Sequence, residues 1–118
     1  MWAAALSAPP WDGPPVWIHA DLDRQNLLAA GGRLAGVIDF GALGAGDPAC
    51  DLMVAWKLFD EPNRRLFREL TRADHASWER GRGWACSQAV VALAYYTEET
   101  HPVLVRESRA WLAALTAG

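Results

Sequence analysis

The sequence predicts an α+β domain that is mainly helical, with a few short strands in its first third and helices after them. Short apolar segments bounded by glycine and proline come before Asp47, whereas apolar residues recur at helical spacing after it. The 118 residues suffice for one domain with a real core, and a composition of 52% hydrophobic and 21% charged residues is that of a folded chain. Strands followed by helices are typical of a domain in which a helical bundle backs a polar loop.

The first third of the chain predicts short strands around a polar segment. Trp2 to Leu6 has the pattern of a helix end, and the prolines and glycine of residues 8–15 predict a loop. Strands are then expected over residues 16–18, 27–30 and 33–38. Gly31 and Gly32 suit the positive φ angles of a tight turn between the last two. We expect this small sheet to frame the polar segment from His19 to Asn26.

Helices are expected from Asp47 to the end of the chain. Gly41 to Gly46 indicates a flexible connector, after which Asp47 is the expected N-cap of a helix and Pro48 its first residue. Further helices are expected after the break at residues 60–62, from a cap at Asp74, and from Leu104 to Leu115 after the turn at residues 101–102.

The apolar faces of these helices are expected to be buried. Gly81 and Gly83 predict close packing or a kink in the long helix, because each weakens it by about 1 kcal/mol relative to alanine. The nearly continuous apolar run from Ala89 to Tyr96 is expected to be surrounded by protein. The other residues expected in the core are Leu52, Ala55, Trp56, Phe59, Leu66, Phe67, Leu70, Trp78, Trp84, Ala85 and Trp111.

Charge and composition argue against several classes of protein. A formal net charge of −3 gives no basic footprint for nucleic acid, and no apolar stretch is long enough to span a bilayer. The N-terminus has no secretory pattern, so we expect a cytoplasmic protein. Cys50 and Cys86 lack metal-binding spacing and are expected to be buried thiols.

The residues that point to chemistry are Asp21, Asn26 and Asp39, each at the edge of a predicted strand. Phosphoryl transfer needs a carboxylate to orient and deprotonate the attacking hydroxyl, and oxygen ligands for the magnesium that neutralises the phosphates. The segment from His19 to Asn26 reads HxDxxxxN, and residues 38–41 read IDFG at a separation that a hairpin can close. The order of these residue types therefore indicates a phosphotransferase.

These motifs resemble the catalytic loop and the metal-binding segment of the aminoglycoside phosphotransferases, a branch of the protein-kinase-like superfamily. Residues 46–52, GDPACDL, resemble the continuation of that pattern, and the resemblance extends from about Trp2 to Leu115. It implies that residues 1–118 are a protein-kinase-like C-terminal catalytic lobe, truncated or a fragment, whose N-terminal lobe is missing. This sequence has Ala20 where many members have glycine, and Asp23, Arg24 and Gln25 where many have His-Pro-Gly, which alters the charge beside the base.

The resemblance also implies roles for single residues. Asp21 resembles the catalytic base, and Asn26 and Asp39 resemble the ligands of Mg²⁺ bound to ATP. His19, Asp47 and Asp51 resemble residues that support the catalytic loop. The implied reaction is ATP-dependent transfer of a phosphoryl group to a hydroxyl of a small molecule, an aminoglycoside-like antibiotic or a related metabolite. Without the missing lobe, the isolated chain is expected to be inactive and to self-associate through its exposed lobe interface.

Two other functions fit the sequence. The chain is a non-catalytic remnant, or a binding module completed by a separate chain, if no nucleotide-binding lobe accompanies it. A metal-dependent hydrolase using His19, Asp21 and Asp39 is less favoured, because no second histidine stands at ligand spacing. Glu98 and Glu99 have the charge to meet a cationic substrate, although an exposed helix end explains them more simply.

Overall fold

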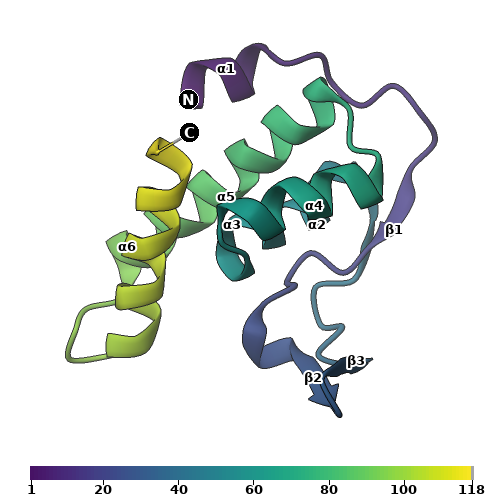
Figure 1. Ribbon diagram of the computed structural model, residues 1–118. Helices are drawn as coiled ribbons and strands as arrows, with labels where there is room; N and C mark the ends of the chain where they lie inside the picture. The colour runs from purple at the N-terminus through teal and green to yellow at the C-terminus, as the bar shows by residue number, and fades with distance from the viewer. Residues whose placement is uncertain (118) are drawn as a thin grey trace.

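The computed structural model describes residues 1–117 and confirms an α+β domain that is mostly helical, with small antiparallel sheets (Figure 1). Among these residues no helix is both long and apolar enough to cross a membrane. In chain order the elements are α1 (Trp2–Ser7), β1 (Val16–Ile18), the 3-10 helix η1 (Arg24–Asn26), β2 (Leu27–Ala30), β3 (Arg33–Val37), β4 (Gly44–Gly46), α2 (Ala49–Leu52), α3 (Val54–Leu58), α4 (Glu61–Thr71), α5 (His75–Tyr95) and α6 (Pro102–Thr116).

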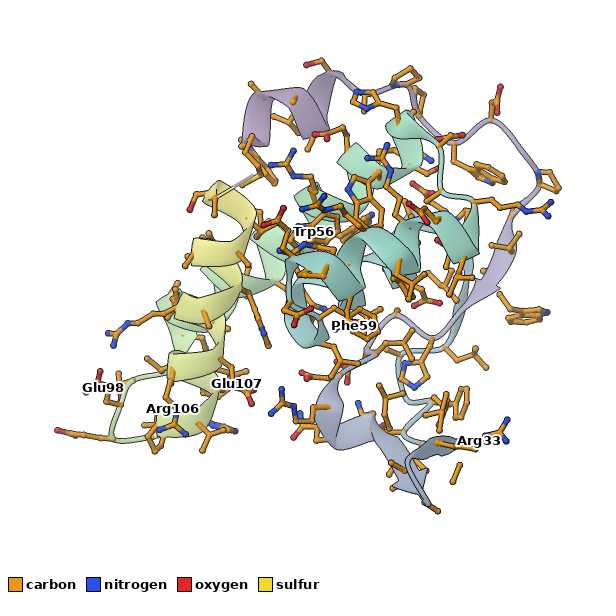
Figure 2. The ribbon with its side chains drawn as sticks, in the orientation of Figure 1. Arg33, Trp56, Phe59, Glu98, Arg106 and Glu107 are labelled. Atoms are coloured by element: carbon orange, nitrogen blue, oxygen red, sulfur yellow. The ribbon has the colours of Figure 1, made fainter. Side chains whose placement is uncertain are left out.

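Helix α5 organises the helical part of the domain. It contacts α1, α2, α3 and α6, and Figure 1 shows it running through the middle of the helices while the β2–β3 hairpin projects from them. The core lies between these helices, where Figure 2 shows Trp56. The Trp56 ring meets that of Trp78, with ring centroids 4.7 Å apart. Met53 and Leu115 are fully buried beside them. The capping of α5 by Asp74, whose carboxylate accepts from the Ser77 amide at 2.7 Å, is confirmed.

The glycines of α5 allow other helices to approach it closely. A Cβ built on Gly81 would lie 2.9 Å from the Leu52 Cβ and 3.3 Å from the Ala49 carbonyl oxygen. A Cβ on Gly83 would lie 2.8 Å from the Ala5 Cβ of α1. All three distances are shorter than ordinary van der Waals contact, so the predicted close packing is confirmed, and the helix continues through both glycines.

The strands form two separate pairs. Strands β2 and β3 pair antiparallel, and Gly31 and Gly32 between them have φ angles of 58° and 75°, as the hairpin prediction requires. Strand β1 pairs antiparallel with β4, with Val16 opposite Gly46. The prediction of a flexible connector from Gly41 to Gly46 is therefore wrong for its second half, where three small residues add a strand and hold the end of β1 in place.

The helix predictions need three corrections. The helix expected from Pro48 begins at Ala49 and is divided at Met53 into α2 and α3, although the Asp47 carboxylate still accepts from the Ala49 amide at 2.9 Å. Leu66 and Leu70 of α4 are exposed, because only Phe67 packs inward, against Phe59.

The third correction concerns the apolar end of α5. Val90, Val91 and Tyr95 are exposed in place of being surrounded by protein, and Trp84 is 45% exposed. The physical reason is that α6 covers one side of this helix only. The side that stays open borders a cavity.

Candidate active site

The polar loop from His19 to Asn26 joins β1 to β2 and is held by its own histidine. His19 is buried, and its Nε2 lies 2.8 Å from the Ile38 carbonyl oxygen at the end of the hairpin. Its Nδ1 accepts from the Asp21 amide at 3.1 Å. Because Nδ1 is the acceptor, Nε2 carries the proton and donates to Ile38. One neutral imidazole thus ties the loop to the segment that bears Asp39.

Asp51 of α2 supports the same loop from the helical side. Its carboxylate accepts from the backbone amides of His19, at 2.9 Å, and Ala20, at 2.8 Å. Ala20 has a φ of 70°, a left-handed conformation that disfavours residues with a Cβ. The two hydrogen bonds hold the backbone in this turn. Asp51 therefore contacts the loop through both of its carboxylate oxygens.

Asp47 has different partners. Besides capping α2, its carboxylate pairs with the Arg80 guanidinium at 2.8 Å, and Arg80 also donates to the Pro9 carbonyl oxygen at 2.6 Å. Within residues 1–117 its hydrogen bonds thus go to α2 and α5, and none goes to the His19–Asn26 loop. Asp47 thus joins α2 to α5, whereas the resemblance had implied that it supports the loop.

The structure brings Asp21, Asn26 and Asp39 to the base of the hairpin. The Asn26 side-chain amide donates to the Asp21 carbonyl oxygen at 2.8 Å and faces its carboxylate at 3.4 Å. The Asn26 carbonyl oxygen accepts from the Ile38 amide at 2.9 Å, so Asp39 follows directly after the residue paired with Asn26. Asp39 has a φ of 59°, and its carboxylate accepts weakly from the Gly41 amide at 3.4 Å.

The side chains at this place offer oxygen atoms of the kind that magnesium binds. The Asn26 NH₂ group donates to Asp21, so the amide oxygen of Asn26 points away from that contact. Asp39 is exposed, and its carboxylate has one weak hydrogen-bond partner among the described residues. An amide oxygen and a carboxylate are hard ligands that fit a hard cation. Asn26 and Asp39 are the residues that would hold Mg²⁺ here.

A cavity of about 760 Å³ opens beside Asp21. One wall is the polar loop, and the opposite wall is built by α5 and α6. The α5–α6 wall is largely aromatic and apolar, and it includes Trp84, Val91, Tyr95, Tyr96, Leu104 and Trp111. The sequence prediction missed this wall, because an apolar run in a helix looks the same whether it packs against protein or lines a cavity.

A buried ion pair forms the floor of this cavity. The Lys57 ammonium lies 3.2 Å from the Asp23 carboxylate, and the two side chains are 2% and 7% exposed. Lys57 also donates to the Gln88 side chain at 3.1 Å and lies 4.8 Å from the centroid of the Trp111 ring. The pair links the polar loop to α3, α5 and α6. The negative charge that the sequence places beside Asp21 is therefore balanced by Lys57.

Cys50 lies under the same loop. Burial and, to a smaller extent, the nearby carboxylates of Asp51 and Asp47 together raise the pKa of its thiol to about 11. Both Cys50 and Cys86 are buried free thiols, as predicted. At neutral pH Cys50 is thus a neutral packing residue.

Residues 1–84 match the model of the phosphotransferase enzyme family. The chain belongs to this family. An aminoglycoside 3'-phosphotransferase of Escherichia coli is 36% identical over 61 residues, and these cover 52% of this chain and 22% of that relative. The chain thus spans less than a quarter of the length of this curated relative. No solved structure matches the chain. The polar loop of this phosphotransferase family member lies inside the matched residues, whereas most of the aromatic wall of the cavity follows residue 84.

Proposed function

We propose that this chain carries the catalytic half of an ATP-dependent phosphotransferase that acts on a hydroxyl of a small molecule. One arrangement carries the proposal. The Asn26 side chain donates to the Asp21 carbonyl oxygen at 2.8 Å, and Asp39 follows Ile38, whose amide donates to the Asn26 carbonyl oxygen. A cavity opens next to Asp21. A carboxylate that faces a cavity and adjoins a pair of oxygen ligands has the arrangement that phosphoryl transfer requires. Aminoglycoside-like antibiotics and related hydroxylated metabolites are the acceptors that the family relationship suggests.

The chain's own residues have separate tasks in this reaction. Asp21 accepts the hydrogen bond of the acceptor hydroxyl and takes its proton as the oxygen bonds to the γ-phosphorus of ATP, while the bond from that phosphorus to the β-phosphate oxygen breaks. Asn26 and Asp39 are the expected ligands of Mg²⁺, which supplies charge neutralisation at the phosphates when bound. His19 and Asp51 fix the loop from opposite sides, so that Asp21 is oriented before the substrate arrives.

A nucleotide-binding lobe of protein-kinase-like type is the expected partner of this chain. Large apolar side chains are exposed on the projecting hairpin and its neighbours, which is unusual for a surface that meets only water. They are Trp17, Leu28, Leu34, Phe40 and Leu43. We propose that this surface packs against the lobe, and that the isolated chain self-associates through it. Sedimentation of the wild-type chain and of a Leu34→Lys variant tests this, with a smaller association constant expected for the variant.

The proposal is tested by phosphoryl transfer from γ-labelled ATP to hydroxylated small molecules. We expect negligible transfer by residues 1–118 alone. In a protein that joins this chain to a nucleotide-binding lobe, Asp21→Asn should lower kcat by about 10²- to 10⁴-fold. Asp12→Asn makes the same chemical change at an exposed loop position and should leave kcat unchanged. A kcat for Asp21→Asn within twofold of the wild type would refute the role of Asp21.

A binding measurement separates this reaction from that of a metal-dependent hydrolase. The phosphotransferase should bind ATP only with Mg²⁺ present and should not hydrolyse phosphate esters. Asn26→Ala should weaken the Mg²⁺-dependent binding measured by calorimetry. Hydrolysis of a phosphate ester that requires His19 would favour the hydrolase instead.

A further inference from the structure

The cavity beside Asp21 has an unusual combination of much aromatic surface and little free charge. Its charged lining residues are Asp21, Asp23, Asp47 and Lys57. Asp23 is paired with Lys57, and Asp47 is paired with Arg80. Within residues 1–117, Asp21 is thus the lining carboxylate without an ion pair. Only the proposed base carries unbalanced charge toward a ligand.

Other carboxylates of the described residues do not add to this lining. Glu98 is engaged with Arg109 at 2.7 Å, and Figure 2 shows it at the turn between α5 and α6. Glu107 of α6, also labelled in Figure 2, is outside the lining residues. Recognition of a polycation needs several carboxylates that are free to pair with ammonium groups. This cavity presents one such carboxylate, and that one is proposed to meet a hydroxyl.

The aromatic side chains supply the recognition surface instead. Trp84 and Tyr95 of α5 are exposed toward solvent at the cavity, and Tyr95 and Tyr96 stack edge to face with ring centroids 4.8 Å apart. Trp111 lines the floor, where the Lys57 ammonium already occupies one of its faces. Exposed rings around a cavity gain most from an apolar or aromatic ligand that displaces water from them.

We propose that the acceptor is an uncharged hydroxylated molecule with an aromatic or extended apolar group, and that polycationic aminoglycosides are poor ligands. The inference rests on the proposed function in that Asp21 marks the end of the cavity where the hydroxyl lies. Most of the aromatic wall lies beyond the residues that match the family, so family membership does not determine the acceptor.

The test is a binding comparison on the purified chain, at low ionic strength so that charge attraction is not screened. Phenyl β-D-glucopyranoside is the neutral probe. Its 2-amino-2-deoxy counterpart differs by one amine, and kanamycin is the polycation. The measurements are made at about pH 6, where these amines are protonated. Calorimetry should show that the neutral glycoside binds at least threefold more tightly than its amino counterpart and that kanamycin binds more weakly than both. Equal or tighter binding of either cationic probe, or failure of the neutral probe to bind at millimolar concentration, would overturn the proposal.

A pair of adjacent residues gives a matched control. Val91 is 63% exposed and lines the cavity, whereas Val90 is 51% exposed on the same helix outside the lining. Val91→Glu should strengthen binding of the amino glycoside about two- to fivefold, as expected for a partly exposed ion pair. Val90→Glu should leave it unchanged, and equal effects of the two variants would contradict this placement of the ligand. None of these measurements uses phosphoryl transfer, so their failure and the failure of the Asp21 experiment are separate results.

Discussion

The strongest test of the loop geometry is the removal of the Asp51 carboxylate. This side chain reaches the His19 amide at 2.9 Å and the Ala20 amide at 2.8 Å, and it is the group that holds Ala20 at a φ of 70°. Asp51→Ala leaves both amides without their acceptor and leaves the left-handed backbone at Ala20 without compensation. The substitution changes no residue that is proposed to touch a substrate.

The size of the effect follows from these two hydrogen bonds. A hydrogen bond to a charged group contributes roughly 1.5–3 kcal/mol. Asp51 is half-buried, so water replaces part of each bond, and the sum is expected near the lower limit. We therefore expect Asp51→Ala to lower the free energy of unfolding by about 3 kcal/mol. Asp51→Asn keeps one acceptor oxygen but turns an NH₂ group toward the other amide, so its loss should be about half as large.

Equilibrium unfolding in urea, followed by tryptophan fluorescence, measures these free energies. With a slope of about 2 kcal/mol per molar urea, Asp51→Ala should lower the midpoint by about 1.5 M. Asp12→Ala removes a carboxylate from an exposed loop position and should leave the midpoint unchanged. The reasoning fails if Asp51→Ala costs less than about 1 kcal/mol, or if Asp51→Asn is as stable as the wild type.

Three further predictions concern stability in and around the site. Ala20→Gly should raise the free energy of unfolding by about 0.5–1 kcal/mol, because glycine adopts the φ of 70° without strain, and a decrease in urea unfolding would contradict this. Gly81→Ala should lower it by about 1 kcal/mol despite the better helix propensity of alanine. The new Cβ would stand 2.9 Å from the Leu52 Cβ. An increase in the free energy of unfolding would mean that α2 moves away at no cost. Between about pH 9 and pH 11 the unfolded Cys50 thiol ionises while the folded one, with a pKa of about 11, keeps its proton, so stability should fall across this range. Cys50→Ala should show a smaller fall in thermal midpoint than the wild type over the same range, and equal falls would show that the thiol is not responsible.

The parts of the fold that the sequence predicted well are those set by local chemistry. Gly31 and Gly32 specify a turn through their φ angles, and Asp74 caps α5 through a carboxylate three residues from the amide that it meets. The polar loop is of the same kind, because Asp21 and Asn26 are joined within one short segment. Such features depend on neighbours along the chain, which the sequence displays directly.

The parts that the sequence did not predict depend on partners far along the chain. Strand β4 forms because its small residues fit beside β1, and nothing within Gly44–Gly46 reveals that partner. Val91 and Tyr95 have the composition of buried residues, but they line a cavity because α6 covers only one side of α5. Hydrophobicity reports that a side chain avoids water and does not report whether protein or ligand will cover it.

The Asp23–Lys57 pair shows how this affects the interpretation of the site. In the sequence, Asp23 and Arg24 alter the charge beside the proposed base. In the structure, Lys57 balances the charge of Asp23, and the side chains of this pair are buried. Because removing one partner of a buried pair leaves the other charge uncompensated, the two residues act as one neutral unit. The charge that an acceptor meets is then that of Asp21 alone, and the aromatic wall becomes the larger part of what the cavity offers to a ligand.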